Sequence, residues 1–206
     1  MAKPVIISSQ FLESMIHAPM PLRAEMTDIH SAVMDGADGL MLVSETSIGK
    51  FPVEAIKVVN DVCIAAEQHF RYQEHFTDML SNAEKPLNKL EAMANSSVKS
   101  AFNLQSPIIL TFSDTGRIVR LLSKYRPYAL IVIVTENMFL ARQAALIRSC
   151  QGIYVGSLQN MNEITNRAMA MLKRNNYVRS GNDVIYISGI AEKEINCRYQ
   201  MKLLEV

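Results

Sequence analysis

The sequence predicts an α/β protein with a mostly parallel sheet. Apolar runs typical of strands buried on both faces alternate with stretches of helical periodicity, which is the pattern of βα units. The last two strands, expected at 183–188 and 199–204, have no helix between them and can therefore pair antiparallel. At 206 residues, the chain can bury a sizeable core in one or two domains.

The bulk composition excludes some classes of function. The chain is 49% hydrophobic and 20% charged with a net charge of +1, so it offers no electrostatic case for binding nucleic acid or a membrane surface. No apolar run approaches the roughly 20 residues of a membrane-spanning helix. The cysteines lack metal-ligand spacing, which favours buried reduced thiols and a cytoplasmic location. The four histidines also lack metal-ligand spacing, so no metal site is expected. The residues concerned are Cys63, Cys150 and Cys197, and His17, His30, His69 and His75.

The first seventy residues predict two βα units. We expect strands at 4–7 and 40–43, and helices at 10–16, 24–34 and 53–70. Asp35-Gly36 ends the second of these helices, and Pro52 stands near the first position of the third. Two strands with their helices neither close a barrel nor cover a sheet, so we expect this piece to be the end of something larger.

The remainder of the chain predicts a second domain. Residues 71–86 are polar without a clear period and indicate a linker or a partly helical crossing segment, before a helix at 87–103. Strands and helices then alternate, in the order strand 107–111, helix 116–125, strand 129–135, helix 139–148, strand 153–155 and helix 162–175.

Four segments together resemble a known family. In order and spacing, "KPVIISSQFLESM", "PMPLRAEMTDIHSAVMDGADGLML", "SETSIGKFPVEAI" and "LLSKYRPYALIVIVTENMFLARQAALIRSCQGIY" resemble the last part of pyruvate kinase. The resemblance implies that residues 1–67 are the last two βα units of a (β/α)₈ barrel. Residues 68–86 would be the linker, and 87–206 the C-terminal α/β domain with effector and assembly roles.

The resemblance also implies an activity. The family transfers a phosphoryl group from phosphoenolpyruvate to ADP with Mg²⁺ and K⁺, usually as a homotetramer. Its catalytic lysine and both Mg²⁺-binding carboxylates would precede residue 1. Because phosphoryl transfer depends on positioned cations, we expect this chain alone to be inactive and to bind no cofactor. The alternative is a divergent regulatory or assembly module that binds a phosphorylated metabolite without kinase activity.

Ser9 and Gln10 directly follow the first strand. Active sites of (β/α)₈ barrels lie at the C-terminal ends of the strands. The resemblance implies that Ser9 replaces a threonine that helps deliver a proton to the substrate, with Gln10 and Glu13 matching the family. The alternative is that Ser9 is the N-cap of the helix at 10–16.

A second candidate site segment is "LMLVSETSIGKFP", residues 40–52. It is similar to a family segment that commonly reads L-S-G-E-T-A, and Glu45, Thr46 and Gly49 match. Val43 stands where the resemblance implies a serine, and Ser44 replaces the glycine. In a strand, this one-residue shift turns the hydroxyl to the opposite face.

Arg23 and Glu25, in "PLRAE", resemble a family segment near a subunit interface. The alternative is a solvated helix start, where a glutamate in the first turn is favourable.

The turn in "TFSDTGRIV" is a candidate phosphate site, since backbone N–H groups at a helix N-terminus bind anions. The resemblance implies that Ser113, Thr115, Gly116 and Arg117 hold a phosphate of a sugar-phosphate effector. Asp114 opposes this by charge repulsion. The alternative is simple capping of the helix by Ser113, Asp114 or Thr115.

Two further departures count against control by a sugar bisphosphate. Effector-regulated relatives often carry an arginine at the position of Ile164, although Arg167 follows one turn later. The loop expected to be rich in glycine between the last two strands instead reads "GIAEKEINCRY", residues 189–199, and is acidic and bulky.

Overall fold

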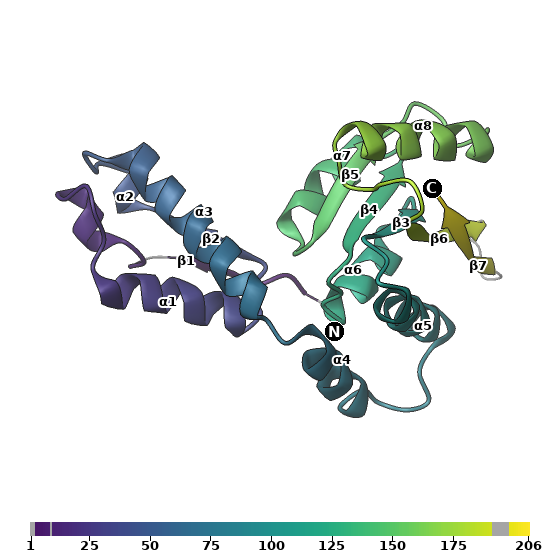
Figure 1. Ribbon diagram of the computed structural model, residues 1–206, viewed down its shortest axis with the longest axis horizontal. Coiled ribbons are helices and arrows are strands. Elements are labelled where there is room, and N and C mark those ends of the chain that lie inside the picture. Colours follow the sequence, from purple (N-terminus) through teal and green to yellow (C-terminus); the bar gives the residue numbers. More distant parts are fainter. Residues whose placement is uncertain (1–2, 9, 191–197) are drawn as a thin grey trace. The chain divides into compact units, whose positions relative to one another are not determined.

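The computed structural model describes residues 3–8, 10–190 and 198–206. It divides into two compact units, an N-terminal unit, Pro4–Arg71, and a C-terminal unit that contains Tyr72–Val206 (Figure 1). Ser9, Cys197 and residues 191–197 of the last loop lie outside the described residues, so the predictions made for them stay predictions.

The N-terminal unit consists of two βα units. Its elements are β1 (Ile6–Ser8), the 3₁₀ helix η1 (Glu13–Ile16), α1 (Arg23–Met34), β2 (Gly39–Met41), α2 (Ser44–Ser47) and α3 (Pro52–His69). The two strands pair in parallel, with Ile6 opposite Gly39 and Ser8 opposite Met41. Ile7 and Leu40 alternate with these residues and pack toward the helices, against a core of Phe11, Leu12, Met15, Ile29, Ala32 and Ala55.

The other face of this two-stranded sheet remains exposed. Ile6 is 46% exposed and Met41 is 49% exposed, and both lie on the side away from the helices. Among the described residues, β1 and β2 pair only with each other. The N-terminal unit therefore presents apolar side chains and two unpaired strand edges.

Local signals explain where the helices of this unit begin and end. Pro52 occupies the first turn of α3, where its missing N–H costs nothing. Gly36, with a φ of 90°, follows α1, and its N–H donates to the carbonyl of Val33, which is the usual way a glycine closes a helix. Both signals were predicted from the sequence and are confirmed.

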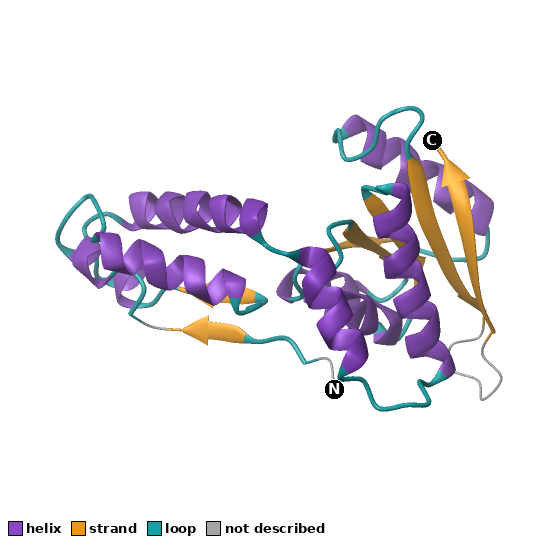
Figure 2. Ribbon diagram, turned by 60° about the horizontal axis from the view of Figure 1, so that its bottom comes forward, coloured by secondary structure: helices purple, strands orange, loops and turns teal. Residues whose placement is uncertain are grey.

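The C-terminal unit is an α/β sandwich around a five-stranded sheet of order β5-β4-β3-β6-β7. Strands β3 to β6 are parallel, and β7 runs antiparallel to β6 as predicted; Figure 2 shows these two neighbouring strands at the end of the chain. The strands are β3 (Ile108–Phe112), β4 (Leu130–Thr135), β5 (Cys150–Tyr154), β6 (Asp183–Ile190) and β7 (Arg198–Glu205). The helices are α4 (Tyr72–Ser81), α5 (Lys89–Leu104), α6 (Arg117–Lys124), α7 (Met138–Gln143), η2 (Ala144–Leu146) and α8 (Met161–Arg174).

Alternating side chains of the central strands form two cores. On one face, Ile109, Ile131 and Ile185 pack with residues of α5, α6 and α7. On the other face, Leu110 and Val132 pack with residues of α8. Figure 1 shows α8 on one side of β3 and β4, with α5 and α6 on the other. Covered faces of this kind explain why the strands read as continuous apolar runs.

Two expected elements differ from the structure near β5. The helix expected at 139–148 ends at Gln143 and continues only as the short 3₁₀ helix η2. The strand expected at 153–155 begins three residues earlier, at Cys150. A Cβ on Gly152 would lie 2.1 Å from the carbonyl oxygen of Ala141, so this glycine lets α7 pack directly on the strand. Gln151 and Gly152 carry no β signal, which is why the sequence hides the beginning of the strand.

Candidate functional site

The first candidate site lies where β1 and β2 end. The strands are parallel, so their carboxyl ends meet at one edge, with Ser8 opposite Met41. Gln10 follows one strand and the segment with Glu45 follows the other, so the fold brings together two of the sequence-predicted regions. Ser9, between Ser8 and Gln10, lies outside the described residues.

Gln10 turns the chain after β1. Its φ of 60° is in the left-handed region, and the residue is exposed. The expectation of a helix from Gln10 is wrong, because the helical turn begins only at Glu13, with Leu12 as its N-cap. The alternative that Ser9 is an N-cap stays a prediction, because Ser9 lies outside the described residues.

Glu45 is buried and bound by backbone amides. Only 2% of the residue is exposed. Its Oε1 accepts a hydrogen bond from the Leu12 N–H at 3.1 Å, and its Oε2 accepts one from the Val43 N–H at 2.9 Å. Burial raises the pKa of the Glu45 carboxyl, but the backbone N–H donors, Val43 and Leu12 among them, outweigh it and lower the pKa below its ordinary value. The carboxylate thus joins the two loops at the edge of the sheet.

The backbone around Val43 and Ser44 is not a strand. Strand β2 ends at Met41, Val43 is the N-cap residue of α2, and Ser44 is its first residue. The expectation of a strand through Val43 is therefore wrong, and so is the argument that a one-residue shift inverts the side chain. Neighbouring residues in a helical turn differ by about 100° rather than 180°. Val43 is 45% exposed at this turn.

Gly49 closes the same turn by a close backbone approach. A Cβ there would lie 2.3 Å from the carbonyl oxygen of Glu45, a distance that no real side chain tolerates. The Gly49 N–H also donates to the carbonyl of Ser44 at 3.0 Å. The turn that holds Glu45 thus requires glycine at this position.

Glu25 performs a similar internal task. Its Oε1 accepts from the Ser14 N–H at 2.8 Å, and its Oε2 accepts from the Ser14 hydroxyl and from the Leu22 N–H. Burial raises its pKa, but these donors, led by the Ser14 hydroxyl, lower it overall. Glu25 thereby ties η1 to the beginning of α1, whereas Arg23 is exposed. A role of either residue in a subunit interface stays a prediction.

The second candidate site is the turn between β3 and α6. The buried Ser113 accepts a hydrogen bond at its Oγ from the Gly116 N–H at 2.9 Å, and Thr115 accepts one at its Oγ1 from the Arg117 N–H at 3.4 Å. Gly116, with a φ of 70°, is the N-cap residue of α6. Two amides that would hold a phosphate are thus bound by hydroxyls of the turn itself. Ile164, in α8, is buried, and Arg167 is exposed one turn later.

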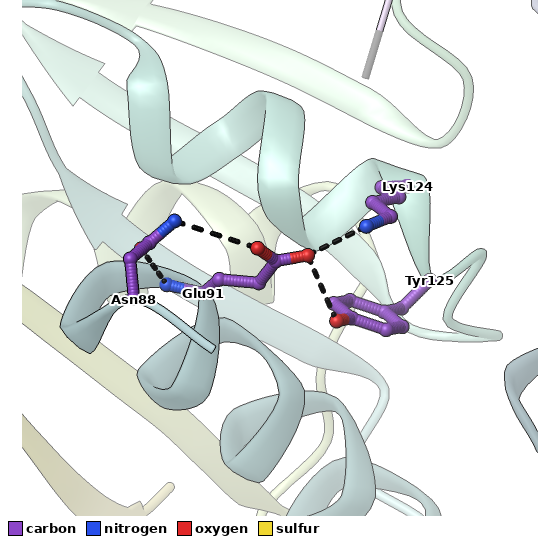
Figure 3. A network of polar contacts seen from close by, with 4 residues as sticks. All are labelled: Asn88, Glu91, Lys124 and Tyr125. Carbon is purple, nitrogen blue, oxygen red and sulfur yellow. Dashed lines mark hydrogen bonds and ion pairs between the residues drawn. The ribbon is translucent and has the colours of Figure 1, made fainter. Parts of the chain in front are cut away.

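A polar network that the sequence did not predict joins α5 to α6 (Figure 3). Asn88 caps α5 by accepting from the Glu91 N–H at 2.8 Å. The Glu91 Oε1 accepts from Lys124 Nζ at 2.5 Å and from the Tyr125 hydroxyl at 3.2 Å. The hydrogen bond from Lys124 lowers the pKa of Glu91. Burial, together with the Glu91 charge, raises the pKa of Tyr125 to about 12. The partners lie 33 and 34 residues apart, so no local pattern reveals them.

The described residues contain neither a candidate metal site nor a helix that could cross a membrane. No group of three or more His, Cys, Asp and Glu side chains that could hold a metal ion occurs among the described residues. None of the helices in the described part of the chain is both long enough and apolar enough to span a bilayer.

The fold and both sites define an α/β protein that joins the end of a βα barrel to a separate α/β domain. Residues 1–56 match the family model "Pyruvate kinase, barrel domain", and residues 91–197 match "Pyruvate kinase, alpha/beta domain". The chain belongs to the pyruvate kinase family. The chain contains the barrel end and the C-terminal α/β domain of that family.

Individual relatives agree along the chain. Pyruvate kinase of Eimeria tenella is 34% identical over 204 residues, which is 99% of this chain and 38% of that protein. Pyruvate kinase of Dictyostelium discoideum is 35% identical over 92% of this chain and 38% of that protein. A crystal structure of pyruvate kinase from Cryptosporidium parvum matches with a TM-score of 0.92 and 35% identity, covering 99% of this chain and 40% of that one. The chain thus spans about two fifths of the length of these relatives.

Proposed function

We propose that this chain belongs to an enzyme that transfers the phosphoryl group of phosphoenolpyruvate to ADP, giving pyruvate and ATP. The observation that carries the proposal is that the barrel model and the α/β-domain model of one family match the same chain in order. A structure of the Cryptosporidium parvum relative is a complex with ADP, which supports ADP as the acceptor. The similarity of whole relatives over more than nine tenths of the chain favours this function over a module without kinase activity.

Within that enzyme, the chain supplies one side of the substrate site. We assign Ser9 and Gln10 to the substrate side at the end of β1. Glu45 is a positioning residue, because both of its carboxylate oxygens are bound by backbone amides. By fixing Leu12 and Val43, it sets the path of both loops at this edge of the sheet.

Mg²⁺ and K⁺ belong to the proposed reaction, where they neutralise charge that develops on the phosphoryl group. The described residues do not fit an Mg²⁺ site, since no cluster of three suitable side chains occurs among them and Glu45 is already engaged. Homo-oligomerisation, with Arg23 and Glu25 near an interface, and a cytoplasmic location are further parts of the proposal.

The turn from Ser113 to Arg117 is proposed to bind a phosphorylated metabolite, which is a second candidate function. The exposed Arg117 in the first turn of α6 supports it. Titration calorimetry of the chain with fructose bisphosphate and with inorganic phosphate tests it. Heat that disappears in Arg117→Gln supports the site, whereas no heat with either compound refutes it.

Kinase activity is tested with two proteins, the 206-residue chain and the product of the full gene that encodes it. Pyruvate formation is followed by coupling to lactate dehydrogenase, with phosphoenolpyruvate, ADP, Mg²⁺ and K⁺ present. We expect turnover by the full product and none by the chain alone. A folded full product without turnover would support the divergent regulatory or assembly module instead. Turnover by the chain alone would contradict the assignment of the essential cations to other residues.

A further inference from the structure

A cavity of about 890 Å³ lies between the end of β5 and one side of α8, within the C-terminal unit. None of the residues of the Ser113–Arg117 turn lines it, whereas Ile164 and Arg167 of α8 do. Apolar side chains from the end of β5, the segment after it and α8 line the cavity, together with two charged side chains of α8. These residues are Ile153, Val155, Ile164 and Met171, and Glu163 and Arg167.

The two charged side chains that line the cavity do not pair with each other. Glu163 and Arg167 are four residues apart on one helix, a spacing at which opposite charges usually pair. Here the Glu163 Oε2 accepts a hydrogen bond from Asn160 Nδ2 at 3.0 Å. Arg167 makes no ion pair or hydrogen bond with any residue that the structure describes. Both charged side chains are exposed and available to a ligand.

We propose that this cavity binds an amphipathic zwitterion, a small molecule with an apolar body and with an ammonium and an anionic group held apart by about one helical turn. The apolar body lies against the apolar lining residues, the anionic group faces Arg167, and the ammonium faces Glu163. A simple anion would meet the Glu163 carboxylate, and a simple cation would meet the Arg167 guanidinium. Only a ligand with both charges matches both side chains. The inference does not depend on the proposed kinase activity.

Gly156 provides a way to block the cavity without disturbing the fold. It lines the cavity, and a Cβ added to it would meet nothing within 4 Å. Its φ is not among the positive values, so a larger residue fits its backbone without strain. A leucine there extends into open space.

Three probes that share one benzene ring test the proposal on the full 206-residue chain. They are 4-(aminomethyl)benzoate, benzoate and benzylamine, and binding is followed by the backbone amide signals in nuclear magnetic resonance spectra. We expect shifts confined to β5, α8 and the segment between them. The zwitterion should bind about two- to fivefold more tightly than either singly charged probe, as exposed ion pairs are worth little each. Equal affinities for the three probes would overturn the proposal.

Variants assign each charge. Arg167→Gln should weaken binding of the zwitterion and of benzoate but not of benzylamine. Glu163→Gln should weaken binding of the zwitterion and of benzylamine but not of benzoate. Gly156→Leu should abolish binding of all three. Arg174→Gln, in the last turn of α8 and outside the cavity lining, is the matched control and should change none. Dispersed spectra confirm that each variant folds. Shifts scattered outside the cavity, or equal weakening by Arg174→Gln, would refute the site.

Discussion

The substitution Glu45→Gln tests whether the buried carboxylate holds the two loops of the candidate site together. A glutamine keeps one oxygen acceptor but turns an NH₂ donor toward the other backbone N–H. One amide, that of Leu12 or Val43, then loses a charge-assisted hydrogen bond and faces an NH₂ donor of a side chain that is only 2% exposed. The cost of such a loss is about 2 kcal/mol. Opening of the loops should therefore become about 30-fold more frequent, because 1.4 kcal/mol is tenfold.

Amide hydrogen exchange measures this opening at single residues. We expect exchange of the Leu12 and Val43 amides to accelerate about 30-fold in Glu45→Gln. Glu54→Gln is the matched control, because Glu54 is an exposed glutamate in the first turn of α3. Unchanged protection of both amides in Glu45→Gln would refute the reasoning. The same loss in Glu54→Gln would show that a general effect of charge had been measured.

The pH dependence of the same amides gives an independent measurement. The pKa of Glu45 is lowered in the folded protein, so its contribution to stability is present above the unfolded-state pKa of about 4.3 and is lost as the pH falls through the lower folded-state pKa. In the wild type, the protection factors of the Leu12 and Val43 amides, corrected for intrinsic exchange, should decrease as the pH falls from the unfolded-state pKa through the folded-state pKa of Glu45. They should stay level in Glu45→Gln. A parallel decrease in both proteins would contradict the assigned role.

Two further substitutions follow from the same contacts. Gly49→Ala should lower the free energy of unfolding of the N-terminal unit by about 1–3 kcal/mol in urea titrations, because its Cβ would lie 2.3 Å from the Glu45 carbonyl oxygen. Gly39→Ala, in the same unit, should change it little, because a Cβ there would meet only the Ile6 side chain at 3.6 Å, and equal effects would contradict the argument. Glu91→Gln should lower the pKa of Tyr125 from about 12 toward about 10, as followed by its ring-carbon resonance at high pH. An unchanged Tyr125 pKa would show that burial alone raises it.

The sequence was sufficient to predict the parallel sheet and the ends of most helices. β3 and β4 are buried on both faces, so their apolar runs are unmistakable, and Pro52 and Gly36 mark helix ends by chemistry that needs no distant partner. The beginning of β5 was missed because packing against α7, rather than a local apolar run, makes a strand of Gln151-Gly152. Tertiary contacts decide such segments.

The candidate site was predictable in position but not in role. Parallel pairing of β1 and β2 places the predicted segments at one edge. That the Glu45 carboxylate binds backbone amides could not be read from the sequence, because Leu12 lies 33 residues away. The four-residue helix α2 carries no apolar period, which is why its residues were expected to continue a strand.

The two-stranded sheet of the N-terminal unit has a practical consequence. Unpaired strand edges beside exposed apolar side chains such as Ile6 and Met41 recruit other strands. We expect the segment 4–71, when it is produced in isolation, to self-associate and to precipitate as its concentration rises. A charged substitution at Met41, on the face that carries no helix, is the single change most suited to keep it in solution during purification.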